Sequence, residues 1–275
     1  MSDQTAVVLP DVKVGVIGGG SMGGAIARGL VASGALPGSS VFVCDHNAAK
    51  LEALAQAGVT TVADADAVLA DAPDVVVLAV KPQVLGALLK QLSGRLGDAL
   101  VVSIAAGVAL ETLEGALPGS RVVRVMPNLP VAVRSGASAV CGGHGATAAD
   151  VELVRELFAQ LGAAKVMRED QLDAEGAVVG CAPAFFALAV DAFTRAGIRA
   201  GLPAAAAREM VNATMLGVAE MLAESGEHPR AYMERVTSPG GTTAAALYEL
   251  EPLLTQGAYD AVDAALERTA ELARG

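Results

Sequence analysis

The sequence predicts a doubly wound α/β domain over residues 1–166, followed by an all-α domain over residues 167–275. Three observations lead to this fold class. Short Val-rich runs alternate with helical patterns in the first part, a glycine-rich loop directly follows the first run, and helical periodicity alone continues after about Met167. Strands that are almost continuous in apolar residues are typical of a parallel sheet that is buried between helices.

The first part alternates predicted strands and predicted helices. The predicted strands are Val12–Ile17, Val41–Cys44, Val75–Val80, Leu100–Ile104, Arg121–Met126, Ala137–Cys141 and Ala163–Val166. The predicted helices between them are Met22–Leu30 ending at Gly34, Leu51–Ala55 closed by Gly58, Pro82–Leu92, Leu110–Leu117, and a helix capped by Thr147 or Asp150 that runs to Leu161. Gly after a helix and Pro in its first turn are typical boundaries. This order predicts a parallel sheet with helices on both faces.

The second part predicts helices over Leu172–Ala196, Pro203–Glu224 and roughly Thr242–Arg274. An uncharged apolar run of 15 residues lies between Glu175 and Asp191. Because a membrane-spanning helix needs about 20 apolar residues, we interpret this run as a buried helix. The domain is more apolar than a single layer of helices requires, which indicates a subunit interface.

Composition excludes several classes of function. The net charge of −11 argues against partners such as nucleic acid and an anionic membrane surface, which reward clusters of Lys and Arg. The odd number and wide spacing of Cys44, Cys141 and Cys181 argue against a disulfide framework and a zinc site. We expect no metal, small buried thiols in a reducing compartment, and, since no signal-peptide pattern opens the chain, a cytoplasmic location.

A glycine-rich loop follows the first predicted strand. Gly18, Gly20 and Gly23 satisfy the pattern G-x-G-x-x-G, with Ser21 and Met22 inside it. In this pattern the first glycine permits a tight turn, the second lets a pyrophosphate approach, and the third lets helix and strand pack closely. The helix N-terminus offers free N–H groups to phosphates. Its place between strand and helix predicts a Rossmann-type dinucleotide site rather than a turn without a ligand.

Asp45 ends the second predicted strand. An acid at this place normally binds the ribose hydroxyls of the cofactor and repels a 2′-phosphate, so the sequence favours NADH over NADPH. No Arg follows in the next residues, His46 and Asn47, although Lys50 could neutralise a phosphate. The alternative interpretation is that Asp45 only caps the next helix.

The same glycine loop also fits G-x-S-x-G, the pattern of a hydrolase nucleophile. That reading is disfavoured, because a nucleophile elbow needs earlier strands to form the oxyanion hole and only a short tail precedes this strand. The histidines His46, His144 and His228 also lack a distinctive triad context.

Three further loops follow predicted strands. They are Val80–Pro82, Ser103–Gly107 and Arg124–Pro130, which contains Met126, Pro127 and Asn128. Ligands of open α/β sheets bind outside the carboxyl ends of the strands. Small residues such as Ala105 and Ala106 leave room for a flat ring. Each of these loops alone would predict nothing, but three loops at the carboxyl ends of neighbouring strands predict one cleft.

The segment Ser238–Thr243 is a Pro-Gly-Gly turn that leads into a helix with Thr242 or Thr243 as the predicted N-cap. Free backbone N–H groups and hydroxyls form a compact anion site. In a helical domain without Lys, this is the best place for a substrate carboxylate. The alternative is an ordinary capped turn between helices.

Together these residues resemble the pyrroline-5-carboxylate reductase family over nearly the whole chain. The marks are the glycine loop with Ala25 and Ile26, Val80–Pro82, Ser103–Gly107, Met126–Asn128 and, most specifically, Ser238–Thr243. The resemblance implies NAD(P)H-dependent reduction of Δ1-pyrroline-5-carboxylate to L-proline. It also implies a homodimer interlocked through the helical domains, larger rings of dimers, and an active site between one subunit's nicotinamide and helices of the dimer.

The resemblance assigns roles to individual residues. Those expected at the cofactor are Gly18, Gly20, Ser21, Met22, Gly23, Asp45, Val80, Lys81, Pro82, Ala105, Ala106, Gly107, Pro127 and Asn128. Those expected to be catalytic are Thr243 and Ser238, and those expected at the substrate are Gly240, Gly241, Thr242 and Cys181. The substrate carboxylate would bind the turn's N–H groups, and Thr243 would hydrogen-bond the ring nitrogen.

One segment departs from the family. The family has Ser-Gly-Ser-Gly-Pro-Ala where this chain has Val179–Ala184, so hydroxyls are lost and Cys181 replaces a serine. A related cyclic imine is therefore an alternative substrate. A β-hydroxyacid dehydrogenase would need a Lys in the helical domain, and no Lys follows Lys165. A non-catalytic dinucleotide-sensing module would not need the second anion site at Ser238–Thr243.

Overall fold

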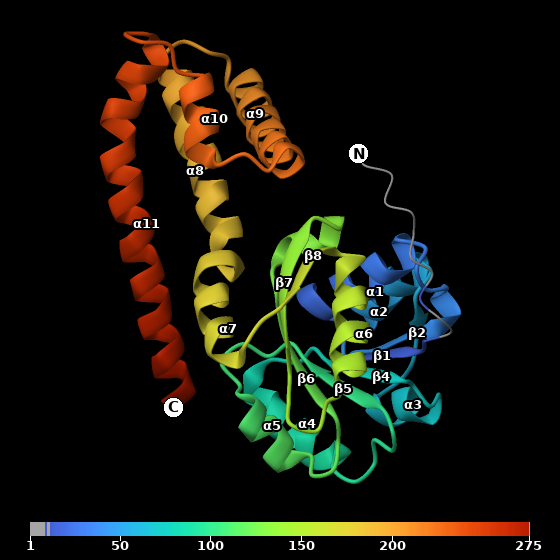
Figure 1. The fold of residues 1–275 in the computed structure, drawn as a ribbon. Coiled ribbons are helices and arrows are strands. Elements are labelled where there is room, and N and C mark those ends of the chain that lie inside the picture. The colour runs from blue at the N-terminus through green and yellow to red at the C-terminus, as the bar shows by residue number, and fades with distance from the viewer. Residues whose placement is uncertain (1–8, 10–11, 275) are drawn as a thin grey trace. The chain divides into compact units, whose positions relative to one another are not determined.

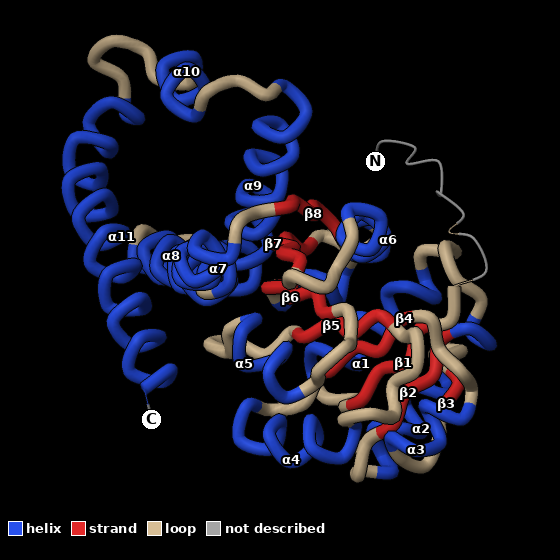
Figure 2. Tube along the Cα trace, turned by 60° about the horizontal axis from the view of Figure 1, so that its bottom comes forward, coloured by secondary structure: helices blue, strands red, loops and turns tan. Residues whose placement is uncertain are grey.

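The computed structural model describes residue 9 and residues 12–274 (Figure 1). The chain divides into two compact units. The first comprises the residues up to Cys181 together with those from Leu266 onward, and the second comprises Ala182–Ala265. The strands all belong to the first unit, and the described part of the second unit contains only helices and loops (Figure 2).

The first unit is built on an eight-stranded sheet of order β3-β2-β1-β4-β5-β6-β7-β8. The strands are β1 (Val14–Ile17), β2 (Val41–Cys44), β3 (Thr60–Thr61), β4 (Val75–Leu78), β5 (Leu100–Ser103), β6 (Val122–Pro127), β7 (Gly136–Gly142) and β8 (Gly162–Val166). The order reverses direction at β1, between β2 and β4, which is the topological switch point of doubly wound folds. The predicted fold class is confirmed.

The sheet is parallel from β3 to β6, as predicted, but β7 pairs with β6 antiparallel and then with β8 in parallel. The prediction of a wholly parallel sheet was therefore wrong at this edge. The physical reason is the short connection, the 3₁₀ segment Leu129–Val133, between β6 and β7. A parallel crossover needs a dozen or more residues, whereas a short connection returns the chain antiparallel.

Helices cover both faces of the sheet, because successive strand residues point to opposite sides. The helices of this unit are α1 (Ser21–Ala32), α2 (Ala48–Gln56), α3 (Ala65–Ala70), α4 (Pro82–Leu92), α5 (Leu110–Ala116), α6 (Ala148–Ala159) and α7 (Glu169–Glu175). Val14 and Val16 pack in the apolar core beneath α1, α2 and α6. Val76 and Leu78 pack in a second core, beneath α3, α4, α5 and α7. Burying each such side chain contributes about 1.5–3 kcal/mol.

Several predicted boundaries are confirmed, and some elements were missed. Thr147 caps α6 in a reciprocal capping box with Asp150, and Pro82 occupies the first turn of α4. The first strand begins at Val14 rather than Val12. Strand β3 and helix α3 were not predicted, because elements of two and six residues are too short to show a period.

The second unit consists of α8 (Ala182–Arg199), α9 (Ala204–Ser225), α10 (Pro229–Arg235) and most of α11 (Thr242–Arg274). Helices α8 and α9 pack against each other. Helix α10 was not predicted. It begins at Pro229, with His228 as its N-cap, and an ion pair joins Arg230 to Glu251 on α11.

One continuous helical segment, Glu169–Arg199, is long and apolar enough to cross a membrane by length and composition alone. Only 11% of the apolar 18-residue stretch within this segment is buried. The prediction of a buried helix was therefore wrong for the single chain, since Phe186 is 60% exposed and Leu188 is 66% exposed. Other large apolar side chains of the second unit, such as Leu253 on α11, are exposed in the same way.

Candidate functional site

The glycine loop has the geometry that its spacing predicts. Gly18 has a φ of +110°, and a Cβ there would lie 2.7 Å from the carbonyl oxygen of Ala79. A Cβ on Gly23 would lie 2.0 Å from the carbonyl oxygen of Gly18, so only glycine lets α1 approach β1 this closely. A Cβ on Gly20, in contrast, would meet nothing within 4 Å. The loop is therefore tight on the protein side and open on the side where a pyrophosphate would lie.

Helix α1 presents its N-terminus at this loop. It begins at Ser21, and its N-cap, Gly20, supplies no side-chain hydrogen bond to the first turn. The N–H groups of Ser21, Met22 and Gly23 have no acceptor within the helix, as in every first turn. No acidic side chain lies in that turn. Uncapped N–H groups and the positive end of the helix dipole together suit a phosphate.

A cavity of about 660 Å³ opens beside this loop. Five residues predicted for the cofactor line it: Gly18, Gly20, Asp45, Val80 and Lys81. The register explains why they meet, since the last residues of β2, β1 and β4 stand side by side and each is followed by one of these loops. The open cradle at Gly20 and the lining acid and base fit the adenosine and phosphate groups of a dinucleotide.

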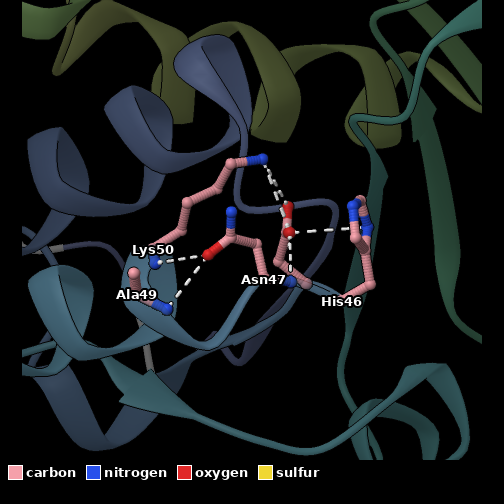
Figure 3. Close-up of polar contacts among 5 residues, drawn as sticks. His46, Asn47, Ala49 and Lys50 are labelled. Carbon is pink, nitrogen blue, oxygen red and sulfur yellow. Dashed lines mark hydrogen bonds and ion pairs between the residues drawn. The ribbon is translucent and has the colours of Figure 1, made fainter.

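Asp45 lies in the turn between β2 and α2, and its side chain is only 5% exposed. Its Oδ1 accepts the backbone N–H of Asn47 at 2.9 Å, and the Lys50 ammonium lies 3.3 Å from Oδ2 (Figure 3). Partial burial would raise the pKa of Asp45, but the N–H of Asn47 and the charge of Lys50 outweigh it and lower the pKa below 3.8. The carboxyl is therefore ionised at neutral pH.

The alternative role of Asp45 as a helix cap is contradicted. The N-cap of α2 is Asn47, whose Oδ1 accepts the N–H groups of Ala49 and Lys50 (Figure 3). The Asp45 carboxylate instead accepts the backbone N–H of Asn47, which is the N-cap itself, and pairs with the side-chain ammonium of Lys50.

The other predicted cofactor residues follow the neighbouring strands. Ser103 ends β5 in the same row as Leu78 of β4. Ala105 is buried, Ala106 is exposed and Gly107 has a φ of +73°. These residues lie beyond the carboxyl end of β5, at the sheet edge that carries the glycine loop, but they do not line the 660 Å³ cavity.

Asn128, directly after β6, is occupied by backbone contacts. Its Oδ1 accepts the N–H of Ala137 on β7 at 2.8 Å, and its Nδ2 donates to the carbonyl of Val179 at 3.2 Å. Pro127 is the last residue of β6 and is buried. Asn128 therefore joins the β6–β7 connection to the helical segment that contains Val179, the first of the residues that differ from the family pattern.

Val179 belongs to a π-helical segment, Gly176–Gly180, between α7 and α8. The N–H of Cys181 bonds the carbonyl of Gly176 at 3.1 Å, and a Cβ at Gly176 would lie 2.6 Å from Met126 Cε. The preceding Glu175 is 9% exposed, and burial raises its pKa to about 7. Single π-helical turns occur frequently at functional sites.

The cysteines are free thiols. Cys44 and Cys141 are buried, as predicted, whereas Cys181 is partly exposed. Burial raises the pKa of the Cys44 thiol to about 11, so this thiol is protonated at neutral pH.

The Ser238–Thr243 turn belongs to the second unit and precedes α11. Gly240 has a φ of +70°, and the N–H of Gly241 donates to the carbonyl of Ser238 at 3.0 Å. Helix α11 begins at Thr242, and the carbonyl of Gly241 accepts the N–H of Ala245. Thr242 and Thr243 are therefore the first helical residues rather than the N-cap, which corrects the prediction.

The position of Thr242 and Thr243 in the first turn of α11 favours an anion site. The N–H groups of Thr242 and Thr243 lie in the first turn and have no acceptor within the helix. A Cβ on Gly241 would lie 2.4 Å from the hydroxyl oxygen of Ser238, so the glycine leaves this hydroxyl close to the backbone. The whole turn is accessible in the single chain.

Several residues at the dinucleotide cavity were not predicted from the sequence. Asp64, which caps α3, lines the cavity together with Gln83 and Gln91 of the α4 region. Asp64 could have been predicted only as the N-cap of α3, but that helix has six residues and is too short to show an apolar period in the sequence. Gln83 and Gln91 belong to no motif, and they lie at the cavity because the apolar side chains of α4 share a core with those of β1 and β4.

The fold and the glycine-loop cavity define a dinucleotide-binding oxidoreductase. Two family models match the chain: "NADP oxidoreductase coenzyme F420-dependent" over residues 13–107 and "Pyrroline-5-carboxylate reductase dimerisation" over residues 169–272. Pyrroline-5-carboxylate reductase of Arabidopsis thaliana is 38% identical over 271 residues, covering 95% of this chain and 96% of the relative. The chain belongs to the pyrroline-5-carboxylate reductase family.

Solved structures agree with this assignment. A pyrroline-5-carboxylate reductase from Coxiella burnetii superimposes with a TM-score of 0.89 at 33% identity, covering 96% of this chain and 99% of that chain. The pyrroline carboxylate reductase of Plasmodium falciparum, solved with NADP bound, gives a TM-score of 0.85 at 28% identity, covering 95% and 98%. The matched dimerisation model includes the apolar helix Glu169–Arg199 and supports a homo-oligomer.

Proposed function

We propose that this protein reduces the imine of Δ1-pyrroline-5-carboxylate to L-proline, with NADH or NADPH as the reductant. The observation that supports the proposal is the Ser238–Thr243 turn, whose N–H groups at the start of α11 are available to an anion, in a chain that also holds a dinucleotide cavity. Family membership supplies the reaction, since the relatives named above are pyrroline-5-carboxylate reductases.

The turn would bind the substrate carboxylate. Its N–H groups at Thr242 and Thr243 lie at the positive end of α11, and the Ser238 hydroxyl lies beside Gly241. The hydroxyl oxygen of the exposed Thr243 side chain would accept a hydrogen bond from the protonated ring nitrogen. Fixing both ends of a small ring orients the imine carbon, which contributes to the rate by proximity.

The chain needs little acid–base chemistry for this reaction. A protonated imine is already electrophilic, so Thr243 has only to hold the protonated nitrogen in place. When bound, the dihydronicotinamide supplies the hydride that the imine carbon accepts. As the new C–H bond forms, the π electron pair of the C=N bond moves to nitrogen, and the product is a secondary amine.

The glycine loop and the two neighbouring loops would hold the cofactor. Gly20 leaves room for the pyrophosphate, and the N–H groups of α1 bind it. Val80 and Lys81 line the same cavity, and the small residues 105–107 extend the sheet edge beyond it. The family model and the NADP-bound relative support a nicotinamide cofactor.

A related cyclic imine is a second candidate substrate. The residues that depart from the family, Val179 and Cys181, lie partly exposed at the π-helical segment, where hydroxyls would otherwise stand. The isopropyl group of Val179 and the thiol of Cys181 favour a less polar ring than two hydroxyls do. We further propose a cytoplasmic enzyme, with dimers assembled into a larger ring.

The substrate assignment is tested with and without the carboxylate. Turnover of pyrroline-5-carboxylate is compared with that of 1-pyrroline, which lacks this group. We expect a strong preference for the carboxylated ring, and we expect Ser238→Ala to reduce this preference mainly through KM. The exposed Thr255→Ala on α11 serves as the control. Equal turnover of both rings by the parent would contradict a carboxylate site at the turn.

A further inference from the structure

The turn between β2 and α2 carries a charge pair at the wall of the dinucleotide cavity. Asp45 and Lys50 both line the cavity. The Lys50 ammonium lies 3.3 Å from Oδ2 and 3.5 Å from Oδ1 of Asp45. An acid at this place binds ribose hydroxyls, whereas a base binds a 2′-phosphate. The chain therefore presents both recognition groups at one point.

The pair changes the charge that a cofactor would meet. Asp45 alone would repel a 2′-phosphate, which carries about two negative charges near neutral pH. Lys50 compensates that carboxylate, and the N–H of Asn47 occupies Oδ1 as well. His46 lies 3.5 Å from Oδ1 but is turned to solvent, with 94% of its side chain exposed. Of the other charged groups that line the cavity, Asp64 is negative and Lys81 is positive.

The two partners differ in exposure to solvent. The Asp45 side chain is 5% exposed and is fixed by the turn, whereas the Lys50 side chain is 41% exposed. Asn47 caps α2, and its Oδ1 accepts the backbone N–H of Lys50, so the start of the helix is held by this contact (Figure 3). The four-carbon stem of lysine beyond it has rotatable bonds. Lys50 can thus leave the carboxylate for a phosphate without a change of backbone.

We propose that Lys50 is a specificity-determining residue that makes the cavity accept NADPH as well as NADH. With NADH, Asp45 accepts the ribose hydroxyls and Lys50 stays with the carboxylate. With NADPH, Lys50 turns to the 2′-phosphate and screens it from Asp45. The inference rests on the proposed function only in assuming a nicotinamide dinucleotide as the ligand.

The test measures binding without catalysis. The full-length protein is titrated calorimetrically with ADP-ribose and with 2′-phospho-ADP-ribose, which contain no nicotinamide and cannot react. Lys50→Met removes the charge and keeps the length of the side chain, and Lys50→Arg keeps the charge. Lys90→Met removes a charge from α4 outside the cavity and is the matched control.

We expect Lys50→Met to weaken binding of the 2′-phosphorylated ligand by about fivefold while changing that of ADP-ribose by less than about twofold, the upper size expected of one partly exposed ion pair. Lys50→Arg restores the lost affinity, and Asp45→Asn strengthens only the phosphorylated ligand. Equal effects of Lys50→Met on both ligands, or none, would overturn the proposal. A parent protein that binds neither ligand would overturn the proposal and the cofactor site together. Binding as expected without imine reduction would sink only the proposed function.

Discussion

Glu175 gives a stability prediction whose size follows from the structure. The carboxyl is 9% exposed at the start of the π-helical segment, its Oε2 has no hydrogen-bond partner, and burial raises its pKa from 4.5 to about 7. The folded state therefore favours the protonated acid. Below about pH 4.5 both states are protonated, and the free energy of unfolding is not reduced. As the pH rises to about 7 the unfolded chain ionises first, so stability is lost.

The loss amounts to roughly 3 kcal/mol, because each pKa unit is worth about 1.4 kcal/mol and the shift is about 2.5 units. Glu175→Gln removes the titration and should raise the free energy of unfolding near pH 8 relative to that near pH 5 by an amount of this order. The assay is urea unfolding at both pH values and at one protomer concentration, because unfolding of an oligomer depends on concentration.

The exposed Glu52→Gln on α2 is the matched control, since it removes a carboxyl that already faces solvent. If the free energies of unfolding of the parent and of Glu175→Gln differ by the same amount at both pH values, the prediction is wrong, because the pKa of Glu175 is then not raised in the folded protein. A pH dependence of the opposite sign would show that a cationic partner holds the carboxylate ionised.

Three further predictions concern the loop, the strand connection and the interface. Gly20→Ala should leave the melting temperature unchanged, since the added Cβ meets no protein atom, and should weaken dinucleotide binding. Gly23→Ala should lower the melting temperature, because its Cβ would lie 2.0 Å from a carbonyl oxygen. Calorimetry measures both quantities, and equal melting temperatures of the two variants would contradict this contrast. Asn128→Ala should reduce the free energy of unfolding by about 1–3 kcal/mol, since it leaves the backbone N–H of a β7 residue and the carbonyl of Val179 without partners. Denaturant unfolding measures this loss. A smaller loss would mean that water replaces both hydrogen bonds. Leu253→Glu, at a position 75% exposed in the single chain, should shift the oligomer toward smaller species in sedimentation; an unchanged distribution would place Leu253 outside the interface.

The sequence was most informative where local chemistry determines the structure. The glycine spacing at Gly18, Gly20 and Gly23 predicted the turn, the close packing and the open phosphate side. Of the two predicted caps, Thr147 and Asp150, Thr147 is the N-cap of α6, and Pro82 lies at the start of α4 as predicted. Each signal depends on a few consecutive residues, which is why it can be interpreted without knowing the tertiary structure.

The missed features depend on contacts between distant segments. The reversal of β7 depends on the length of the Leu129–Val133 connection and on pairing with β6, which apolar periodicity does not reveal. The exposure of Phe186 could not be predicted either, because the pattern of a helix buried in its own chain is the same as that of one buried against a second copy. The partners of Asn128 likewise lie on segments far from it in sequence.

The decisive measurement is the oxidation of NADH and NADPH with Δ1-pyrroline-5-carboxylate by the parent, by Thr243→Ala and by the control Thr255→Ala. We expect fast, saturable turnover by the parent with formation of L-proline. We also expect a large loss of turnover in Thr243→Ala and none in Thr255→Ala, with the dinucleotide still bound by all three proteins. No turnover by a folded parent that binds the dinucleotide would contradict the assignment of this substrate. Undiminished turnover by Thr243→Ala would contradict the role of the Ser238–Thr243 turn at the ring nitrogen.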